Sequence, residues 1–387
     1  MQLSREEIWQ TWRSDRSRER RRLIVVAVVV AVLFLLCLSV RYNAYYYYND
    51  VFVPLTYAQS LWTAVKLQVA HLFDLPYWYQ HDQVVAELGE INYLGALARL
   101  RTCLMTFCAG AALAVGGAIF QTAYRNPMAS PNLLGVTAGV SLGNIVVVLL
   151  YGAAAVGHVY FRYGLCYGFT AACVLLVLLL GRLAGDRREN VSVIEMVMMG
   201  AIVSQAINAF VSYQMYTMEE ENLALLEQIQ LGAFMQVDVV SFAICVASIL
   251  VSLVPILIMR YRLNVIGLDR TETAALGVNA RPYRAVAQIC GVIMTTAAMV
   301  HCGQIGMVTM VVPYIVRTLV GANFKNICIY SVLIGGAVVM VCSLGASFFM
   351  IGETPLPATF IVNIIMVPAF MYILAKQKGG FDAARSA

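Results

Sequence analysis

Long runs of apolar residues, separated by polar stretches, dominate this chain. A bilayer core of about 30 Å requires about 20 apolar residues in helical form, because lipid leaves no partner for an open backbone hydrogen bond. We expect ten membrane spans, at residues 23–40, 94–123, 134–152, 164–182, 193–213, 238–259, 284–301, 304–320, 327–350 and 358–375. The run at 304–320 is the weakest, since Pro313 and Arg317 interrupt it. The pattern predicts an all-α, polytopic integral membrane protein.

Composition supports this prediction and excludes several classes of protein. Of the 387 residues, 61% are hydrophobic and 12% are charged, whereas soluble domains have about 45–50% and about 25%. A soluble fold could not bury so much apolar surface, so a soluble enzyme, a nucleic-acid reader and a disordered scaffold are excluded. Most of the ten cysteines lie in apolar runs, where a thiol behaves as a small hydrophobic group, so we expect no disulfide framework.

The distribution of basic residues predicts the orientation of the chain. The cluster from Arg13 to Arg22 precedes an apolar run with no cleavage site, which indicates a retained signal anchor. With the N-terminus in the cytoplasm and ten alternating spans, 21 of the 26 lysines and arginines fall on the cytoplasmic side. Arg41, Lys66, Arg99, Arg101 and Arg162 fall outside. Such a bias favours ten spans with both termini inside.

These spans divide the chain into three parts. We assign 1–22 to a basic cytoplasmic N-terminus, 23–376 to a membrane domain and 377–387 to a cytoplasmic tail. The membrane domain includes a long external segment, 42–93, whose Tyr45–Tyr48 run is typical of an aromatic belt at the headgroup level. A second external region, 214–237, has leucines at helical spacing and predicts a surface helix.

The cytoplasmic region 260–283 predicts short helices inside a basic loop. Asp269 can cap one of them, Glu272 follows three residues later, and Gly277 is placed to end it. Asn279 can start a second short turn. A simple connector is usually shorter than this, so we favour a docking surface for a cytoplasmic partner.

Small residues predict close helix contacts. Two stripes recur every four residues, Gly135, Gly139 and Gly143 in one and Gly110, Ala114 and Ala118 in the other. Small side chains let helix backbones approach closely in lipid, where no hydrophobic drive brings helices together. The pattern is common in polytopic proteins, so it indicates packing and does not identify a function.

The sequence carries no motif for catalysis or for nucleotide binding. It lacks a P-loop, an H-E-x-x-H pair and a nucleophile elbow, and we expect no catalytic or metal site. The predicted spans hold two acids, Glu195 and Asp238, both near span ends. Ion-coupled carriers usually bury ionisable groups near the midplane, so the energy for any transport should come from elsewhere. The four histidines all map to the outer side, as interface residues or as contacts to a metal or haem.

Four ordered segments resemble one family of membrane proteins. Residues 110–143, GAALAVGGAIFQTAYRNPMASPNLLGVTAGVSLG, are similar to the FecCD-type permeases of ATP-binding-cassette (ABC) importers for ferric siderophores, haem and cobalamin. The matching positions are Gln121, Asn126, Pro127, Ala129, Pro131, Leu133, Leu134, Gly135, Val136 and Gly139. The later segments are 267–279 (GLDRTETAALGVN), 303–321 (GQIGMVTMVVPYIVRTLVG, which includes Pro313) and 354–374 (TPLPATFIVNIIMVPAFMYIL).

This resemblance implies an architecture and a set of partners. It implies the type II importer fold, with ten helices per subunit in the bacterial cytoplasmic membrane, and a second permease subunit, identical or different. It further implies two cytoplasmic ATPases, which bind ATP and Mg²⁺, and an extracytoplasmic substrate-binding protein. This chain would itself bind no cofactor and no nucleic acid, and would not be an enzyme.

The resemblance also implies roles for particular residues. The ATPase-coupling segment would comprise Asp269, Glu272, Ala275, Leu276 and Gly277, and contacts to the binding protein would come from Arg99 and Arg101. Candidate polar residues for the pathway are Gln121, Asn144, Gln205 and Asn208, although hydrogen bonds between helices are an alternative use for each.

Several positions depart from the family pattern. Leu100 and Arg101 are adjacent where the family has L-P-R, Tyr314 replaces a histidine, Ser343 and Ser347 replace an Asp and an Arg, and Pro355 replaces an acid. We expect an iron complex as cargo, a ferric siderophore first and haem or cobalamin next, and His301 with Cys302 favours an iron-containing ligand. A stand-alone secondary carrier or channel, and a receptor subunit that works through 42–93, are the alternatives from other classes.

Overall fold

A helix is found at each of the ten positions where an apolar run predicts a span. The computed structural model describes residues 5–39, 83–184, 193–232, 239–268, 270–347, 349–351 and 354–385. Its elements are α1 (Arg5–Ser39), α3 (Gln83–Tyr124), η2 (Pro131–Leu134), α4 (Val136–Tyr151), η3 (Gly152–His158), α5 (Val159–Ala184), α6 (Val193–Thr217), α7 (Glu220–Leu231), α8 (Val239–Ile258), α9 (Arg260–Ile266), α10 (Arg270–Ala275), α11 (Ala280–Cys302), α12 (Val308–Val320), α13 (Phe324–Ser347), β1 (Met350–Ile351), β2 (Thr354–Pro355) and α14 (Ala358–Arg385).

The helices confirm the all-α membrane architecture. Within the described residues, seven are long and apolar enough to cross a bilayer, and α12 and the apolar part of α14 are shorter. The two strands form a minimal antiparallel pair, with Met350 opposite Pro355. Three helices extend beyond the predicted spans. Helix α1 begins at Arg5, inside the segment assigned to the N-terminus, and α14 continues to Arg385, inside the segment assigned to the tail. Helix α3 begins at Gln83, inside the segment assigned to the outer side, and no proline interrupts the sequence from there to Tyr124. The aromatic run Tyr45–Tyr48 lies outside the described residues.

Helix α3 forms the centre of the bundle and packs mainly on α13, α11 and α12. Its backbone touches that of α13 where both helices carry glycine. A Cβ atom built on Gly110 would lie 2.2 Å from the carbonyl oxygen of Gly335, and one on Gly335 would lie 2.4 Å from the Cβ of Ala114. The small residues of α3 therefore allow direct contact between two backbones.

The glycine stripe of α4 lies against α5. A Cβ on Gly139 would lie 2.5 Å from Cα of Thr170, and one on Gly143 would lie 2.6 Å from Cα of Cys166. Gly135 precedes the helix with a φ of +81°, a conformation that other residues adopt rarely. The stripe thus supplies both the turn into α4 and its contact surface.

We expect Gly143→Val to destabilise this helix pair by about 2 kcal/mol or more, because the new side chain must displace the α5 backbone. Gly168→Val on α5 is the matched control, since nothing lies within 4 Å of its Cβ position. Thermal unfolding of both variants in detergent measures the difference. Equal transition temperatures would contradict the close contact.

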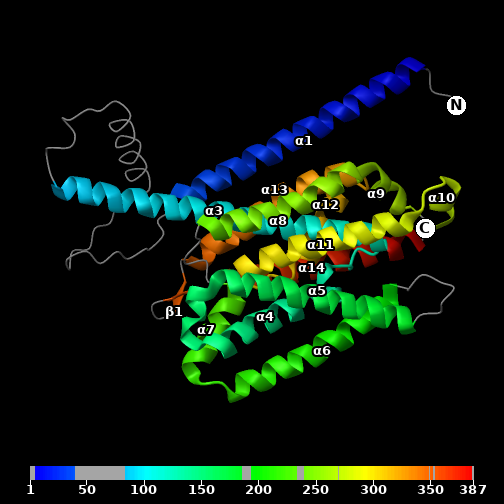
Figure 1. The fold of residues 1–387 in the computed structure, drawn as a ribbon. Coiled ribbons are helices and arrows are strands. Elements are labelled where there is room, and N and C mark those ends of the chain that lie inside the picture. Colours follow the sequence, from blue (N-terminus) through cyan, green and yellow to red (C-terminus); the bar gives the residue numbers. More distant parts are fainter. Residues whose placement is uncertain are drawn as a thin grey trace.

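The surface helix predicted within 214–237 corresponds to α7. Leu226 is fully buried against an apolar cluster that contains Ile145 and Val148 of α4. The carbonyl of Leu231, at the end of α7, accepts a hydrogen bond of 3.0 Å from Oγ1 of Thr359 at the start of α14. Helix α7 therefore closes the end of the bundle opposite to α10 (Figure 1).

Helices α1 and α6 lie at opposite edges of the bundle (Figure 1). Both present large apolar side chains outward, including Leu35 on α1 and Tyr213 on α6, which are 63% and 64% exposed. The N-terminal end of α1 and the C-terminal end of α14 lie at the same end of the bundle as α10 (Figure 1).

Candidate functional site

The α9–α10 segment is fixed to the rest of the fold by its first helix. Leu263 and Ile266 of α9 are fully buried. Between them, the Asn264 side chain accepts a hydrogen bond of 2.7 Å from the backbone N–H of Phe324, at the start of α13. This hydrogen bond links α9 to the start of the long helix α13.

Helix α10 has one anchored face and one exposed face. Thr273 is buried, and its hydroxyl donates to the carbonyl oxygen of Val265 at 3.0 Å. The side chains of Glu272, Ala275 and Leu276 are exposed, with Leu276 at 59%. The packing of Thr273 thus turns three of the predicted coupling residues outward.

The end of α10 confirms the position predicted for Gly277. This residue has a φ of +67°, and the N–H of Val278 donates to the carbonyl of Thr273 at 3.3 Å, a bond typical of a glycine-terminated helix. Nothing lies within 4 Å of the Cβ position of Gly277. Asp269, the predicted cap at the other end, lies outside the described residues.

Asn279 was predicted to start a second short turn, and this prediction was wrong. Its side chain accepts a hydrogen bond of 3.2 Å from the N–H of Arg281, so it caps the long helix α11 directly. A separate short turn is absent from the described residues at this point, because the polar start of α11 (Ala280 to Arg284) continues into its apolar span without a break.

Arg125 connects α3 to the coupling segment, and the sequence analysis did not assign it to the site. Its Nε donates to the carbonyl of Ile266 at 2.9 Å, and one Nη to the hydroxyl of Thr273 at 3.5 Å. Its φ of +53° is uncommon for a residue with a side chain. Its position directly before the matching residues Asn126 and Pro127 was the available signal, but the backbone conformation and the partners of Arg125 cannot be read from the sequence.

Asn126 and Pro127 shape the turn that follows Arg125. The side chain of Asn126 accepts a hydrogen bond of 2.9 Å from the N–H of Met128, and its carbonyl accepts one of 3.0 Å from the N–H of Ala129. Pro127 is exposed, whereas Ala129 is buried. These residues build the loop into η2.

The four candidate pathway residues fall into two pairs. Gln121 is buried and its Nε2 donates to the carbonyl of Met310 on α12 at 2.9 Å. Asn144 is buried and accepts a hydrogen bond of 3.3 Å from the thiol of Cys166 on α5. Gln205 and Asn208 are exposed on α6. The first pair joins helices within the subunit, and only the second faces outward.

The α12 helix is held near the α9–α10 end by polar contacts with α3. The guanidinium of Arg317 donates to the hydroxyl of Thr122 at 3.0 Å. Pro313 is buried inside α12, and the ring of the following Tyr314 contacts that of Phe370 on α14 at 6.0 Å between centroids. Pro313 and Arg317, which interrupt the apolar run 304–320, therefore both contact other parts of the protein.

The structure does not test the predicted contacts on the outer side. Arg101 is half-buried on α3, and the side chain of Arg99 lies outside the described residues. Ser343 is buried, whereas the side chains of Ser347 and Pro355 are also outside the described part. These positions do not form a described cluster, so their role remains a prediction.

His301 and Cys302 contact protein groups. The imidazole of His301 lies 4.3 Å from the ring of Tyr163, between centroids, and the hydroxyl of Tyr163 is hydrogen-bonded to Ser241 at 2.9 Å. Cys302 is fully buried. Among the residues that the structure describes, no group of three or more His, Cys, Asp or Glu side chains is placed to hold a metal ion.

Comparison with known proteins finds one family. The model of the FecCD transport family matches residues 62–376. The molybdate import system permease protein MolB of Haemophilus influenzae is 29% identical over 296 residues, which cover 73% of this chain and 81% of that protein. The iron-uptake system permease protein FeuB of Bacillus subtilis is 27% identical over 274 residues, covering 70% and 78%.

The fold also matches a solved structure, that of a metal-chelate type ABC transporter in an inward-facing conformation. The TM-score is 0.70 at 22% sequence identity, and the match covers 92% of this chain and 99% of the other. At this identity the likeness shows the fold.

Proposed function

The chain belongs to the FecCD transport family and is an ABC transporter permease, and we propose that its importer takes up an iron complex, with a ferric siderophore as the first candidate. The cargo is inferred from the iron permeases among the relatives, such as FeuB. The coupling to an ATPase is supported by the outward-facing surface that Glu272 and Ala275 of α10 form with Leu276, directly after the helix and before Gly277. Leu276 is exposed directly after a helix that is anchored to the fold, which is suitable for contact with a partner protein. We assign this surface, with Asp269, to the contact with an ATPase.

Two neutral polar side chains support the proposed position of the pathway. Gln205 and Asn208 lie on the exposed face of α6, at the edge of the bundle (Figure 1). Such groups are unfavourable against lipid, so we place a second permease subunit, and the route between the two subunits, at this face. Helix α6, Val193–Thr217, contains no lysine or arginine. Its one acid is Glu195, near the start of the helix, so the wall carries no positive charge. Such a wall suits a bulky chelate better than a small dianion.

Cargo identity is the finer part of the proposal. Haem and cobalamin are the alternatives within the family, and MolB, which is named for molybdate, makes that oxyanion a further one. The test is the absorption spectrum of the purified binding protein that partners this permease, titrated with each ligand. We expect saturable binding of a ferric siderophore, and binding of molybdate alone would contradict the proposal.

The proposed orientation places α10 in the cytoplasm. It rests on the excess of basic residues, 21 of 26, on the side that holds both termini. The ends of α1 and α14 lie with α10 at one end of the bundle (Figure 1), which is consistent with an even number of crossings. The proposed location is a bacterial cytoplasmic membrane.

For the outer mouth, we expect Arg99→Glu combined with Arg101→Glu to weaken association with the binding protein about tenfold at low salt. The expected cause is repulsion between the new carboxylates and acidic groups on the partner, which salt would screen. Surface plasmon resonance at two salt concentrations measures the effect. Arg182→Glu, at the end of α5 (Val159–Ala184), is the control. An affinity that is unchanged at both concentrations would remove this role.

A further inference from the structure

A basic surface lies on α1 where this helix enters the apolar layer. It consists of the exposed side chains Arg18, Arg20, Arg21 and Arg22. The membrane-crossing window Arg18–Leu38 begins with these residues, so they lie at the boundary between water and the bilayer core. The phosphate groups of anionic lipids lie at the same level and attract basic segments next to a span. Charge and position therefore favour a partner that carries phosphate.

Helix α1 has a packed side, which fixes its rotation about its own axis. On this side the carboxylate of Glu19 accepts a hydrogen bond of 3.4 Å from the side-chain amide of Asn326 on α13. Val30 comes eleven residues after Glu19, about three turns later, and is buried on the same side. The side of α1 that faces away from α13 is therefore defined.

This outer side of α1 continues from arginines into exposed apolar side chains. Ile24 and Val28 follow Arg21 by three and seven residues, and Val25 follows Arg18 by seven, so each lies on the same side as its arginine. All three apolar side chains are at least 55% exposed. Of the whole α1 span, 17% is buried, against 78% of the span in α3. A continuous strip of charge followed by apolar surface thus faces the bilayer.

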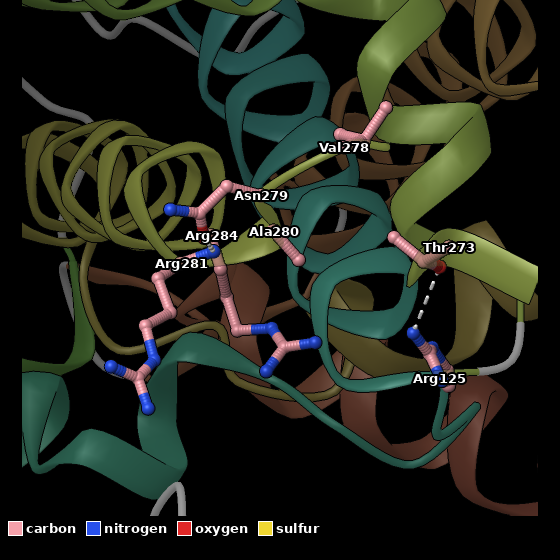
Figure 2. Close-up of a pocket in the computed structure, with 7 residues that line it drawn as sticks. All are labelled: Arg125, Thr273, Val278, Asn279, Ala280, Arg281 and Arg284. Atoms are coloured by element: carbon pink, nitrogen blue, oxygen red, sulfur yellow. Dashed lines mark hydrogen bonds between the residues drawn. The ribbon is translucent and has the colours of Figure 1, made fainter. Parts of the chain in front are cut away.

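The arginines beside α10 are placed differently. Arg125 lines a cavity of about 230 Å³ between α3, α10 and α11, and one of its Nη atoms donates to the hydroxyl of Thr273 (Figure 2). Arg125 is thus used in a contact within the chain. Helix α1 instead lies at the edge of the bundle (Figure 1), where its outer side meets lipid.

We propose that the basic surface of α1 binds the phosphate headgroups of anionic phospholipids, with acyl chains along Ile24, Val25 and Val28. A free phosphate ion would contact the arginines and leave the apolar strip uncovered. An acidic protein surface would likewise stop at the boundary of the bilayer, whereas a phospholipid covers both parts of the strip. The binding lies in the cytoplasmic leaflet in the proposed orientation, and it depends neither on the cargo nor on the coupling segment.

The experiment labels the purified full-length permease, in neutral detergent, with phosphatidylglycerol that carries a photoreactive group in its acyl chain. Mass spectrometry then identifies the labelled residues. We expect saturable labelling of α1 between residues 24 and 36. In Arg18→Gln/Arg21→Gln, the lipid concentration for half-maximal labelling should rise about thirtyfold, because two charges near the headgroup are removed. A photoreactive phosphatidylcholine, which has no net charge, should label α1 weakly and equally in both proteins.

Two further variants separate charge at this site from folding and from total charge. Arg18→Lys/Arg21→Lys keeps both charges and should be labelled at a concentration within about threefold of that for the wild type. Arg182→Gln/Arg260→Gln removes the same charge from the end of α5 and the start of α9, and should leave the labelling of α1 unchanged. Circular dichroism checks the folding of each variant.

Four results would overturn the proposal. Two of them are unchanged labelling in the glutamine variant of α1 and equal loss in the Arg182/Arg260 control. The third is equal labelling of wild-type α1 by the two lipids, which would show that the charge of the headgroup is not recognised. The fourth is displacement of the lipid, where displacement by millimolar inorganic phosphate would indicate a free anion and displacement by the partner ATPase would assign the surface to that protein.

Discussion

A permease that carries Gly277→Val should insert into the membrane and yet lose ATP-driven uptake by at least about tenfold. The φ of Gly277 is +67°, and a β-branched residue is strained there by about 1–2 kcal/mol. The last turn of α10 must then reorganise, which displaces Leu276 from its outward position. Uptake and stimulated ATP hydrolysis in proteoliposomes measure the loss.

Gly168→Val on α5 is the control for added side-chain bulk, since nothing lies within 4 Å of its Cβ position and its φ is not positive. Glu272→Lys should reproduce the loss without any strain, because it reverses the charge of an exposed side chain. If uptake survived both Gly277→Val and Glu272→Lys, the docking role of α10 would be wrong.

The second large effect is expected at Arg125. Arg125→Lys keeps the charge but loses the planar guanidinium, which donates to the carbonyl of Ile266 and to the hydroxyl of Thr273 at the same time. An ammonium group cannot reproduce this pair of hydrogen bonds. We expect the free energy of unfolding to fall by about 1–3 kcal/mol and coupled ATP hydrolysis to fall about tenfold. The ratio of cargo transported to ATP hydrolysed distinguishes a loss of coupling from a loss of folded permease.

A double-mutant cycle tests the proposed cause. Thr273→Val removes the hydroxyl that Arg125 contacts, so the two substitutions together should cost less than the sum of their separate effects. Arg262→Lys is the comparison, because the guanidinium of Arg262 stacks on Tyr283, 4.5 Å from the ring centroid, outside this network. Strict additivity at Arg125 and Thr273 would show that the contact does not position α10.

Hydrophobicity sufficed to place the spans, because an apolar run in lipid has few alternatives to helix. It could not define where helices end in polar surroundings. Helix α3 extends to Gln83 through residues that are compatible with both helix and loop. The length of the helix that Asn279 caps was also mispredicted, because a capping residue indicates where a helix begins but not how long it is.

The candidate site was predictable in part. Gly277 follows from the rule that glycine ends helices, and the structure confirms its positive φ. The exposure of Leu276 and the burial of Thr273 do not follow, because Thr273 lies in a six-residue helix too short for a periodic signal and Leu276 lies in the turn directly after it. The role of Arg125 was not predicted, because it depends on contacts with Ile266 and Thr273, which lie 141 and 148 positions later in the sequence. Only the folded chain brings these together.

Polar residues in the spans show the same limit. Gln121 and Asn144 were candidates for both the pathway and packing, and the structure places both in contacts between helices. Gln205 and Asn208 face outward on α6. Composition cannot separate these pairs, since each consists of an amide side chain in an apolar run.

ATP dependence of uptake tests whether this permease works as part of an ABC importer. The permease is reconstituted into proteoliposomes with its binding protein and ferric siderophore, either alone or with the partner ATPases and enclosed ATP. Accumulation is expected only when both ATPases and ATP are present, and it should be lost in the Gly277→Val variant. Accumulation by the permease alone, without ATP, would contradict an ATP-driven importer and identify a secondary carrier.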